Sequence, residues 1–262
     1  MRLVQALESK HGIHGQWPPA QYWANWKDEC ELATKILVNS EWSKQSLVSE
    51  GIPEEKITVV PLAYENKKKL TQRQQHPAAF NSRRRLKILF LGQVLIRKGI
   101  KELASAAVQM AECPVEWHIV GCGPQVLLDQ LQTVPNVVVH GSVSREACAE
   151  HYLNADVFVL PTHSDGFAIT QLEAFSYGLP VIASRFCGNA VDHLHNGIIL
   201  DEVTADSIIA AIQSLLDSPE LLSQFRSSLM ESPPDFSISR LGKTLATLGE
   251  ELTNQTEAAS RD

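Results

Sequence analysis

The sequence lacks the features that mark several special classes of protein. No apolar run approaches the roughly 20 residues that a membrane-spanning helix needs. The opening residues, MRLVQALESKHGIHG, have no continuous apolar core and already include Glu8 and Lys10, so they do not form a secretory signal pattern. Neither a CxxC pair nor an Asp-x-Asp pair occurs, so the sequence supports neither a zinc knuckle nor a metal-bridged diphosphate held by paired aspartates.

Cysteine is scarce and present in an odd number. The five widely spaced cysteines are typical of a reduced, cytoplasmic protein, and they are Cys30, Cys113, Cys122, Cys148 and Cys187. With 23 Lys and Arg against 30 Asp and Glu, the formal net charge is −7, which argues against a nucleic-acid partner. His163, His193 and His195 form no ligand cluster with a cysteine or an acidic residue in the sequence, so no bound metal is expected.

Short apolar runs alternate with longer helical patterns along most of the chain. We expect strands at 36–39, 57–60, 86–91, 117–120, 137–140, 157–160, 181–184 and 198–200. We expect helices at 41–50, 99–111, 124–132, 144–154, 168–177, 205–216, 219–230 and 237–254. This alternation predicts an α/β fold with a parallel sheet, and the nearly continuous Val, Ile, Leu and Phe content of the strands predicts helices on both faces.

One stretch departs from the composition of the rest. Residues 66–87 hold eight Lys or Arg and no acidic residue, which is typical of an exposed, solvated connector. The alternative is attraction to an anionic membrane surface or to an acidic ligand. We therefore expect a short first part at 1–65, a linker at 66–85, a larger domain at 86–235, and a C-terminal helix and tail at 236–262. The first part is too small to bury a good core by itself.

The candidate site lies where the strands of the larger domain end, because open α/β sheets bind ligands beyond the carboxyl ends of their strands. The segments that follow these strands are GQVLIRKG, GCGP, GSVS, PTHSDGF and RFCGN. In GCGP, Gly121 and Gly123 let the backbone approach a phosphate. The dinucleotide fingerprint fails there, because Val126 stands where its third glycine belongs, and a tight turn is the alternative.

Two further signals point to an anionic ligand with hydroxyl groups. Arg97 and Lys98 are adjacent cations that suit a diphosphate, although a solvated pair would look the same. A helix opens after Asp165, and its first turn presents backbone N–H groups and the positive end of the helix dipole. Glu173 lies farther along that helix beside a packed face, where ribose hydroxyls, or a structural salt bridge with Arg or His, would satisfy its carboxylate.

Taken in order, these segments resemble glycosyltransferase family 4, whose members are retaining enzymes of the two-Rossmann-domain type. The resemblance covers about residues 20–200. It runs through KILVNSEWSKQSLVSEGIPEEKITVVPLAYE at 35–65, GQVLIRKGI at 92–100, IVGCGP at 119–124, VVVHGSVS at 137–144, NADVFVLPTHSDGF at 154–167, ITQLEAFSYGLPVIAS at 169–184 and CGNAVDHLHNGIIL at 187–200. It implies a Rossmann-like donor-binding domain preceded by a partial α/β piece of the acceptor side.

The resemblance also implies roles for single residues. Asp165 and Glu173 occupy the positions of the family's two donor-site carboxylates, with Asp where Glu is usual at the first. Glu173 matches the ribose-binding Glu, and Lys98 matches the diphosphate Lys. Gln93 stands where the family usually has Arg, and Arg97 would compensate.

The backbone of the helix start and one further loop complete the implied donor site. The segment that faces sugar and phosphate consists of Gly166, Phe167, Ala168, Ile169 and Thr170, with Ala168 where many members have Gly. The loop lining the base holds Val143 and Ser144.

The function implied is transfer of a sugar, with retention, from a UDP- or GDP-sugar to a sugar or lipid-linked acceptor, without metal or cofactor. The alternatives are a nucleotide-sugar-binding module without activity, a truncated fragment, or half of a split enzyme. Apolar surface around Trp17, Trp23 and Trp26 is expected to be uncovered, which predicts self-association or a second chain that supplies the rest of the first domain. Any membrane contact would be peripheral, at the inner face.

Overall fold

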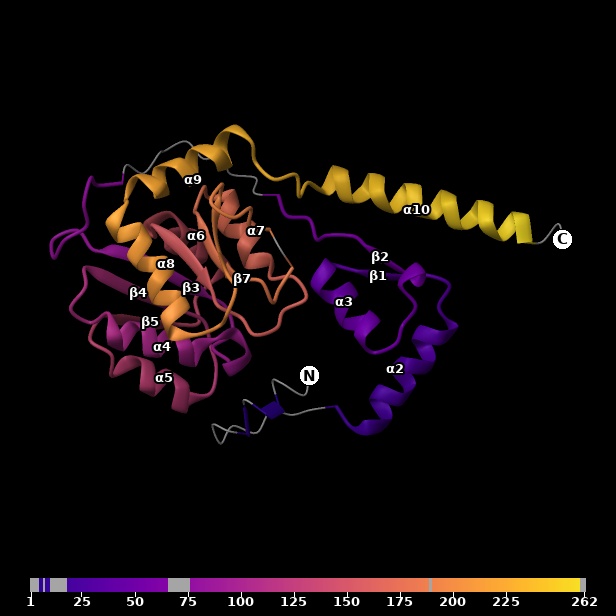
Figure 1. The fold of residues 1–262 in the computed structure, drawn as a ribbon, viewed down its shortest axis with the longest axis horizontal. Coiled ribbons are helices and arrows are strands. Elements are labelled where there is room, and N and C mark those ends of the chain that lie inside the picture. Colours follow the sequence, from indigo (N-terminus) through magenta and orange to yellow (C-terminus); the bar gives the residue numbers. More distant parts are fainter. Residues whose placement is uncertain (1–4, 7, 10–17, 66–75, 189, 260–262) are drawn as a thin grey trace.

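The computed structural model describes residues 5–6, 8–9, 18–65, 76–188 and 190–259 of the chain (Figure 1). In this part of the chain, six parallel strands form the main sheet, in the order β5-β4-β3-β6-β7-β8. Their bounds are β3 Leu86–Leu91, β4 Val115–Val120, β5 Val137–Gly141, β6 Val157–Leu160, β7 Val181–Ser184 and β8 Gly197–Leu200. The strand order runs outward in one direction from β3 to β5 and in the other from β6 to β8. The sheet therefore has a switch point between β3 and β6.

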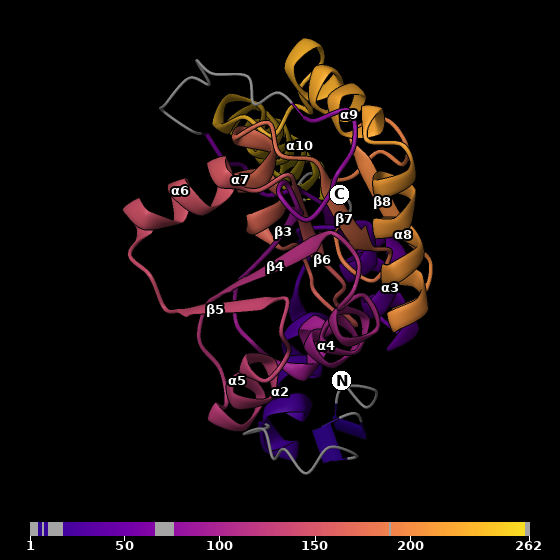
Figure 2. The ribbon, with the colours of Figure 1, turned by 90° about the vertical axis from the view of Figure 1, so that its left-hand side faces the viewer.

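Helices cover both faces of this sheet, as the sequence predicts (Figure 2). They are α4 Ile100–Gln109, α5 Gln125–Gln132, α6 Arg145–Asn154, α7 Ile169–Ser176, α8 Ala205–Asp217 and α9 Glu220–Glu231, and a 3₁₀ turn, η2, spans Ile96–Lys98. Alternate strand residues face opposite ways: Ile88 and Phe90 pack with α4, α5, α8 and α9, whereas Leu89 packs with α6 and α7. This period of two is the reason for the uniformly apolar strands.

The first part of the chain is a small α/β piece with its own two-stranded parallel sheet. Its elements are α2 Ala20–Leu32, β1 Ile36–Val38, α3 Glu41–Ser49, the 3₁₀ turn η1 Glu54–Lys56 and β2 Ile57–Val59. Its buried apolar core consists of Cys30, Ile52 and Ile57, which is small, as its length predicts. Leu32 is 86% exposed and Leu37 is 50% exposed, so apolar surface is uncovered in this part.

The aromatic residues of α2 differ in their exposure. Tyr22 is exposed, whereas Trp23 and Trp26 are half-buried and pack edge to face with ring centroids 6.2 Å apart. Trp17 lies outside the described residues. The uncovered apolar surface of α2 therefore includes Tyr22 and Leu32 beside the two tryptophans.

The expected strands and helices are confirmed, with small shifts at their ends. The strand expected at 117–120 begins at Val115. Glu116 and His118 are polar, but they alternate with buried residues and keep their places in the backbone pairing with β3, so the strand continues through them. The last helix, α10 Ile238–Ala259, runs beyond its expected end and projects away from the main sheet on the side of β1 and β2 (Figure 1). Helix α2 is not among the expected elements. Among the described helices, none has both the length and the apolar character that crossing a bilayer requires.

The segment expected to be an exposed linker packs onto the larger domain over its second half. Residues 66–75 lie outside the described residues. Phe80 is buried in the main core, and Arg84 donates two hydrogen bonds, of 2.8 and 2.6 Å, to the buried carboxylate of Asp156. Residues 76–85 are thus anchored to the larger domain by an aromatic side chain and an ion pair. The polar composition of this stretch does not indicate either contact, so the expectation of an exposed linker is wrong at the two positions that make these contacts.

Candidate functional site

The candidate site is at the switch point, where the loops after β3 and β6 meet. The backbone carbonyl of Arg97 accepts hydrogen bonds from Thr162 Oγ1 at 2.9 Å and from the His163 amide at 2.8 Å. Gly99 lies so close to the β6 loop that a Cβ would come within 1.8 Å of the Pro161 carbonyl oxygen, and its φ is +73°. Glycine is therefore required at this contact, and the two loops form one rigid rim.

A cavity of about 250 Å³ lies inside this rim. Many of the residues expected to contact a ligand line it together, and these are Gln93, Arg97, Lys98, Asp165, Phe167, Ala168, Ile169 and Thr170. They come from two loops and one helix start that are far apart in the sequence. The geometry brings the two cations, one carboxylate and the start of α7 to a single small space.

Lys98 and Asp165 form an ion pair across this cavity. Their side chains are 13% and 16% exposed, so water screens the pair only partly. Arg97 lies beside them, with its guanidinium donating to the Ser164 carbonyl at 3.4 Å and to Gln93 Oε1 at 3.5 Å. Contacts within the chain therefore hold the side chains of Lys98 and Arg97 at the cavity.

The start of α7 has the properties of an anion site. Ala168 occupies its N-cap position, where alanine has no side-chain acceptor to satisfy the first N–H groups. Gly178 ends the same helix with a φ of +63°, and its amide donates to the Phe175 carbonyl at 2.8 Å. Helix α7 is thus held at its far end, with its uncapped start pointing into the cavity that Lys98 lines.

Glu173 lies one turn beyond Ile169 on the same face of α7, outside the group of residues that line the cavity. Its Oε2 accepts a 2.8 Å hydrogen bond from the hydroxyl of Tyr152, which is a buried residue of α6. Within the described part of the chain it forms no ion pair with an arginine or a histidine, so the salt-bridge alternative is not found there.

The glycines after β4 lie at the rim for packing reasons. A Cβ on Gly121 would come within 1.8 Å of the Gly92 carbonyl oxygen, and one on Gly123 within 2.1 Å of the Val94 carbonyl oxygen. Both glycines therefore let the loop after β4 rest directly on the loop after β3, which matches the tight-turn interpretation. They are not among the residues that line the cavity.

The loop after β5 is held in place by the N-cap of α6, the helix that follows it. Ser144 caps α6 by accepting a hydrogen bond from the Ala147 amide at 3.2 Å, and Val143 packs with the core of the α6–α7 face. Neither lines the cavity. Burial, and then the nearby Glu173 carboxylate, raise the pKa of Cys148, which lies one turn after Ser144, so this loop leads into the part of α6 that is near Glu173.

The first part of the chain places side chains against the turn at Gly166, and sequence reasoning did not single them out. Ser40 Oγ donates to the Gly166 carbonyl, and a Cβ on Gly166 would lie 3.1 Å from Asn39 Oδ1 and from Ser43 Oγ. Trp42 packs edge to face on Phe186, with ring centroids 5.6 Å apart. The only sequence signal is the Ser40 N-cap of α3, which indicates a helix start and no ligand.

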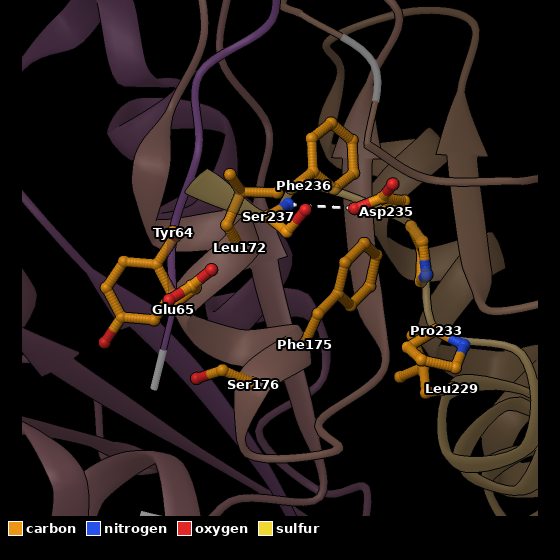
Figure 3. Close-up of a pocket in the computed structure, with 11 residues that line it drawn as sticks. Tyr64, Glu65, Leu172, Phe175, Ser176, Leu229, Pro233, Asp235, Phe236 and Ser237 are labelled. Atoms are coloured by element: carbon orange, nitrogen blue, oxygen red, sulfur yellow. Dashed lines mark hydrogen bonds between the residues drawn. The ribbon is translucent and has the colours of Figure 1, made fainter. Parts of the chain in front are cut away.

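A second cavity, of about 420 Å³, lies behind α7 (Figure 3). Its walls are Leu172 and Phe175 of α7, Tyr64 and Glu65, and the segment at 233–237 (Figure 3). The Tyr64 amide donates to the Phe236 carbonyl at 2.9 Å. Burial, and then the nearby Glu173 carboxylate, raise the pKa of Tyr64, so this residue connects the second cavity with the surroundings of Glu173.

A parallel sheet wound in both directions from its switch point, with cations and an uncapped helix start at that point, defines the class of Rossmann-like ligand-binding domains. The family model described as glycosyl transferases group 1 matches residues 71–229, which is more than half of the chain. The chain belongs to this family.

Several characterised proteins are similar to this chain over part of their length. A D-inositol 3-phosphate glycosyltransferase of Geodermatophilus obscurus is 32% identical over 160 residues, covering 52% of this chain and 34% of that protein. The N,N'-diacetylbacillosaminyl-diphospho-undecaprenol alpha-1,3-N-acetylgalactosaminyltransferase of Campylobacter jejuni is 22% identical over 200 residues, covering 73% and 53%. The chain therefore spans about a third to a half of the length of these relatives.

Solved structures agree on the fold. The Anabaena HepE structure in complex with UDP-glucose superposes with a TM-score of 0.68 at 17% identity, covering 87% of this chain and 68% of that one. Sucrose-phosphate synthase of Thermosynechococcus elongatus superposes with a TM-score of 0.66 at 19% identity, covering 96% and 66%. These likenesses establish the Rossmann-like α/β architecture of the chain.

Proposed function

We propose that the chain binds a UDP- or GDP-sugar at the switch-point cavity and transfers the sugar to an acceptor hydroxyl with retention of configuration. One observation carries the proposal: Lys98, Arg97 and the uncapped start of α7 line the same cavity. A diphosphate is the ligand whose charge and size suit two cations and a row of N–H donors. The acceptor is a sugar or a lipid-linked molecule.

In this mechanism the protein acts mainly on the leaving group. As the bond between the sugar and the diphosphate breaks, negative charge grows on the phosphate oxygens. Once Lys98 has exchanged Asp165 for the diphosphate, its ammonium, the Arg97 guanidinium and the N–H groups of residues 168–170 are in place to neutralise that charge. These donors belong to the protein, so the proposed transfer uses no metal and no cofactor.

The carboxylates of Asp165 and Glu173 contact the other parts of the donor, the transferred sugar and the ribose. When the donor binds, Lys98 exchanges its ion pair with Asp165 for one with the diphosphate. Asp165 then accepts a hydrogen bond from a hydroxyl of the transferred sugar. Glu173 accepts hydrogen bonds from the ribose, and the loop with Val143 and Ser144 lies along the base. Glu173 lies one turn beyond the cavity and near Cys148 of the helix that this loop begins, which supports this division.

Related proteins support the choice of donor. Structures of Anabaena HepE, which has a similar fold, hold UDP, UDP with glucose, or UDP-glucose. The relatives named above are glycosyltransferases by their printed names. The second candidate function is a nucleotide-sugar-binding module without activity of its own, since the groups that line the cavity account for binding of a diphosphate by themselves.

Calorimetry with UDP and GDP tests the donor site. Glu173→Ala should weaken nucleotide binding by about 1–3 kcal/mol through lost charged hydrogen bonds. Lys98→Ala should weaken nucleotide binding as well. The matched control is Lys101→Ala, which should leave nucleotide binding unchanged, because the Lys101 ammonium donates to Gln130 Oε1 at 2.8 Å. Unchanged affinity in both site variants, with the fold intact, would remove the assignment.

An activity assay separates the two candidate functions. The purified chain is given a panel of UDP- and GDP-sugars with sugar and lipid-linked acceptors, and nucleotide release is measured. Acceptor-dependent release supports transfer, and the anomeric configuration of the product, read by NMR, tests retention. Nucleotide binding without release supports the binding module.

A further inference from the structure

The geometry points to Tyr152 as a positioning residue: its phenol holds the Glu173 carboxylate in the orientation in which that carboxylate receives the ribose hydroxyls. This inference rests on the proposed function, since it concerns the same donor site. It adds a residue from a different helix, buried away from any ligand, to the machinery that selects a ribonucleotide.

The contact joins the two helices that cover the same face of the main sheet. Tyr152 lies near the end of α6 and Glu173 lies in the middle of α7, and the hydroxyl donates to Oε2 at 2.8 Å. Tyr152 is only 1% exposed. A buried hydroxyl needs a partner, and here the Glu173 carboxylate is the partner that the structure provides.

The phenol ring of Tyr152 is fixed by its aromatic neighbours. The ring stacks on Tyr177, with centroids 5.3 Å apart and planes at 9°, and it leans on Phe158, with centroids 6.1 Å apart. Stacking and burial leave the ring little rotational freedom. The oxygen that faces Glu173 is therefore held at a fixed position relative to the sheet.

The phenol also stays protonated under all ordinary conditions. Burial, and then the charge of Glu173 and the hydrogen bond to it, raise the pKa of Tyr152 far above its usual range. Tyr152 is therefore a permanent donor to a carboxylate. A neutral donor fixes one oxygen without cancelling the negative charge, so Glu173 keeps its strength as an acceptor for the ligand.

This arrangement has a direct consequence for ligand selection. A glutamate side chain has several rotatable bonds, and ordering it on binding costs free energy. With Oε2 held by Tyr152, the ordering is done before the ligand arrives, and Oε1 is the oxygen that we assign to the ribose. The contact between Tyr152 and Glu173 should therefore contribute to discrimination between ribose and deoxyribose.

The test compares four forms of the chain: wild type, Tyr152→Phe, Glu173→Ala and the double variant. Dissociation constants are measured for UDP and GDP and for their 2′-deoxy and 3′-deoxy analogues. We expect Tyr152→Phe to weaken the ribonucleotide about tenfold. It should weaken at least one deoxy analogue much less, and it should have no further effect in the Glu173→Ala background.

The matched control is Tyr177→Phe, which removes a hydroxyl from the other ring of the same stack. It should leave both the affinity and the ribose preference unchanged. A Tyr152→Phe variant that weakens all nucleotides equally, or that weakens them further in the Glu173→Ala background, would show a merely structural role and overturn the inference. If the wild type binds neither UDP nor GDP, the proposed function itself fails, which is a separate outcome.

A second measurement observes Tyr152 with its hydroxyl in place. The sequence has four tyrosines, so ¹⁹F NMR of the chain grown with 3-fluorotyrosine gives a spectrum that single Tyr→Phe variants can assign. UDP should shift the Tyr152 signal in the otherwise unmutated chain, because the ligand pulls on its Glu173 partner. The shift should disappear in Glu173→Ala, and a Tyr152 signal that ignores UDP at saturation would overturn the inference.

Discussion

Lys98 and Asp165 follow neighbouring strands of the main sheet and form an ion pair inside the switch-point cavity. The cation that we assign to the diphosphate is thus already paired in the unliganded chain. A ligand has to exchange one carboxylate for two phosphates at Lys98, which lowers the net gain from binding. The pair keeps the cation in place before the ligand arrives.

Asp165→Asn should therefore tighten UDP binding and slow transfer. Removing the carboxylate frees Lys98 for the diphosphate, which we expect to improve the dissociation constant by about three- to tenfold. The same change removes the acceptor for the sugar hydroxyl, so turnover should fall. Calorimetry with UDP and the donor assay measure the two effects.

The control for this variant is Asp201→Asn, which removes the carboxylate of an exposed pair with Arg185. It should change neither quantity, because exposed pairs contribute little. Weaker UDP binding in Asp165→Asn would show that Asp165 organises Lys98 rather than competing for it.

Gly99→Ala should be strongly destabilising. The residue has a φ of +73°, and a Cβ would come within 1.8 Å of the Pro161 carbonyl oxygen, which is backbone and cannot move aside. Positive φ and overpacking together should cost about 2–4 kcal/mol of unfolding free energy. Urea titration followed by circular dichroism measures this loss.

The companion variant is Gly242→Ala, in the projecting helix α10, where a Cβ meets nothing within 4 Å. It should leave the stability of the sheet domain unchanged or raise helix stability slightly, by about 0.5–1 kcal/mol. Equal melting of the two variants would contradict the close contact between the two rim loops.

Asp156 should make the chain sensitive to acid. Burial by itself would raise its pKa, but hydrogen bonds from Arg84 and the Lys87 amide, with the His76 ring 3.4 Å away, lower the pKa of Asp156 to about 2. An unfolded aspartate titrates near pH 4, so this carboxylate stabilises the fold fully above about pH 4, and the contribution is lost as the pH falls toward 2. The contribution should be about 2 kcal/mol.

Urea unfolding between pH 2 and pH 6 tests this, with Asp156→Asn as the variant. The wild type should lose stability relative to the variant as the pH falls through this window, and the gap between them should close near pH 2. Glu54→Gln breaks an exposed pair with Lys44 and is the control, since its curve should follow the wild type. A constant gap at every pH would contradict the prediction.

The cysteines should differ sharply in reactivity. Cys122 is exposed in the loop after β4, whereas Cys187 is buried, and burial raises the pKa of Cys187 to about 12. At pH 8, iodoacetamide should label Cys122 first and leave Cys187 unmodified while the chain is folded. Peptide mass spectrometry measures both, and early labelling of Cys187 would show that the contact between the turn at 165 and residue 187 opens readily.

Periodicity was enough to predict the strands of the main sheet and the helices on both of its faces, because each strand is apolar on both sides. It was also enough to locate the edge of the sheet that holds the cavity, since the carboxyl ends of parallel strands all lie at the same edge. Helix α2 was missed because its segment AQYWANWKDECEL mixes aromatic and charged residues with little helical periodicity. The helical conformation of α2 depends instead on a few buried contacts with the rest of the first part, such as those of Cys30.

The pairings inside the site could not be predicted in the same way. Helical spacing places Glu173 on the face of Ile169, but its partner Tyr152 is set by how α6 packs against α7 on the sheet. Lys98 and Asp165 are 67 positions apart, and only the adjacency of β3 and β6 brings them together. The basic stretch at 66–87 likewise gave no sign that Phe80 would be buried.

The two chain segments beside the second cavity have a mechanical consequence. The Tyr64 amide is tied to the Phe236 carbonyl, and Glu65 Oε1 accepts from the Ile238 amide at 3.0 Å. These hydrogen bonds join the segment that leads out of the first part to the segment that leads into α10, so the two segments have one shared register. A residue inserted into one of them alone would misalign both hydrogen bonds.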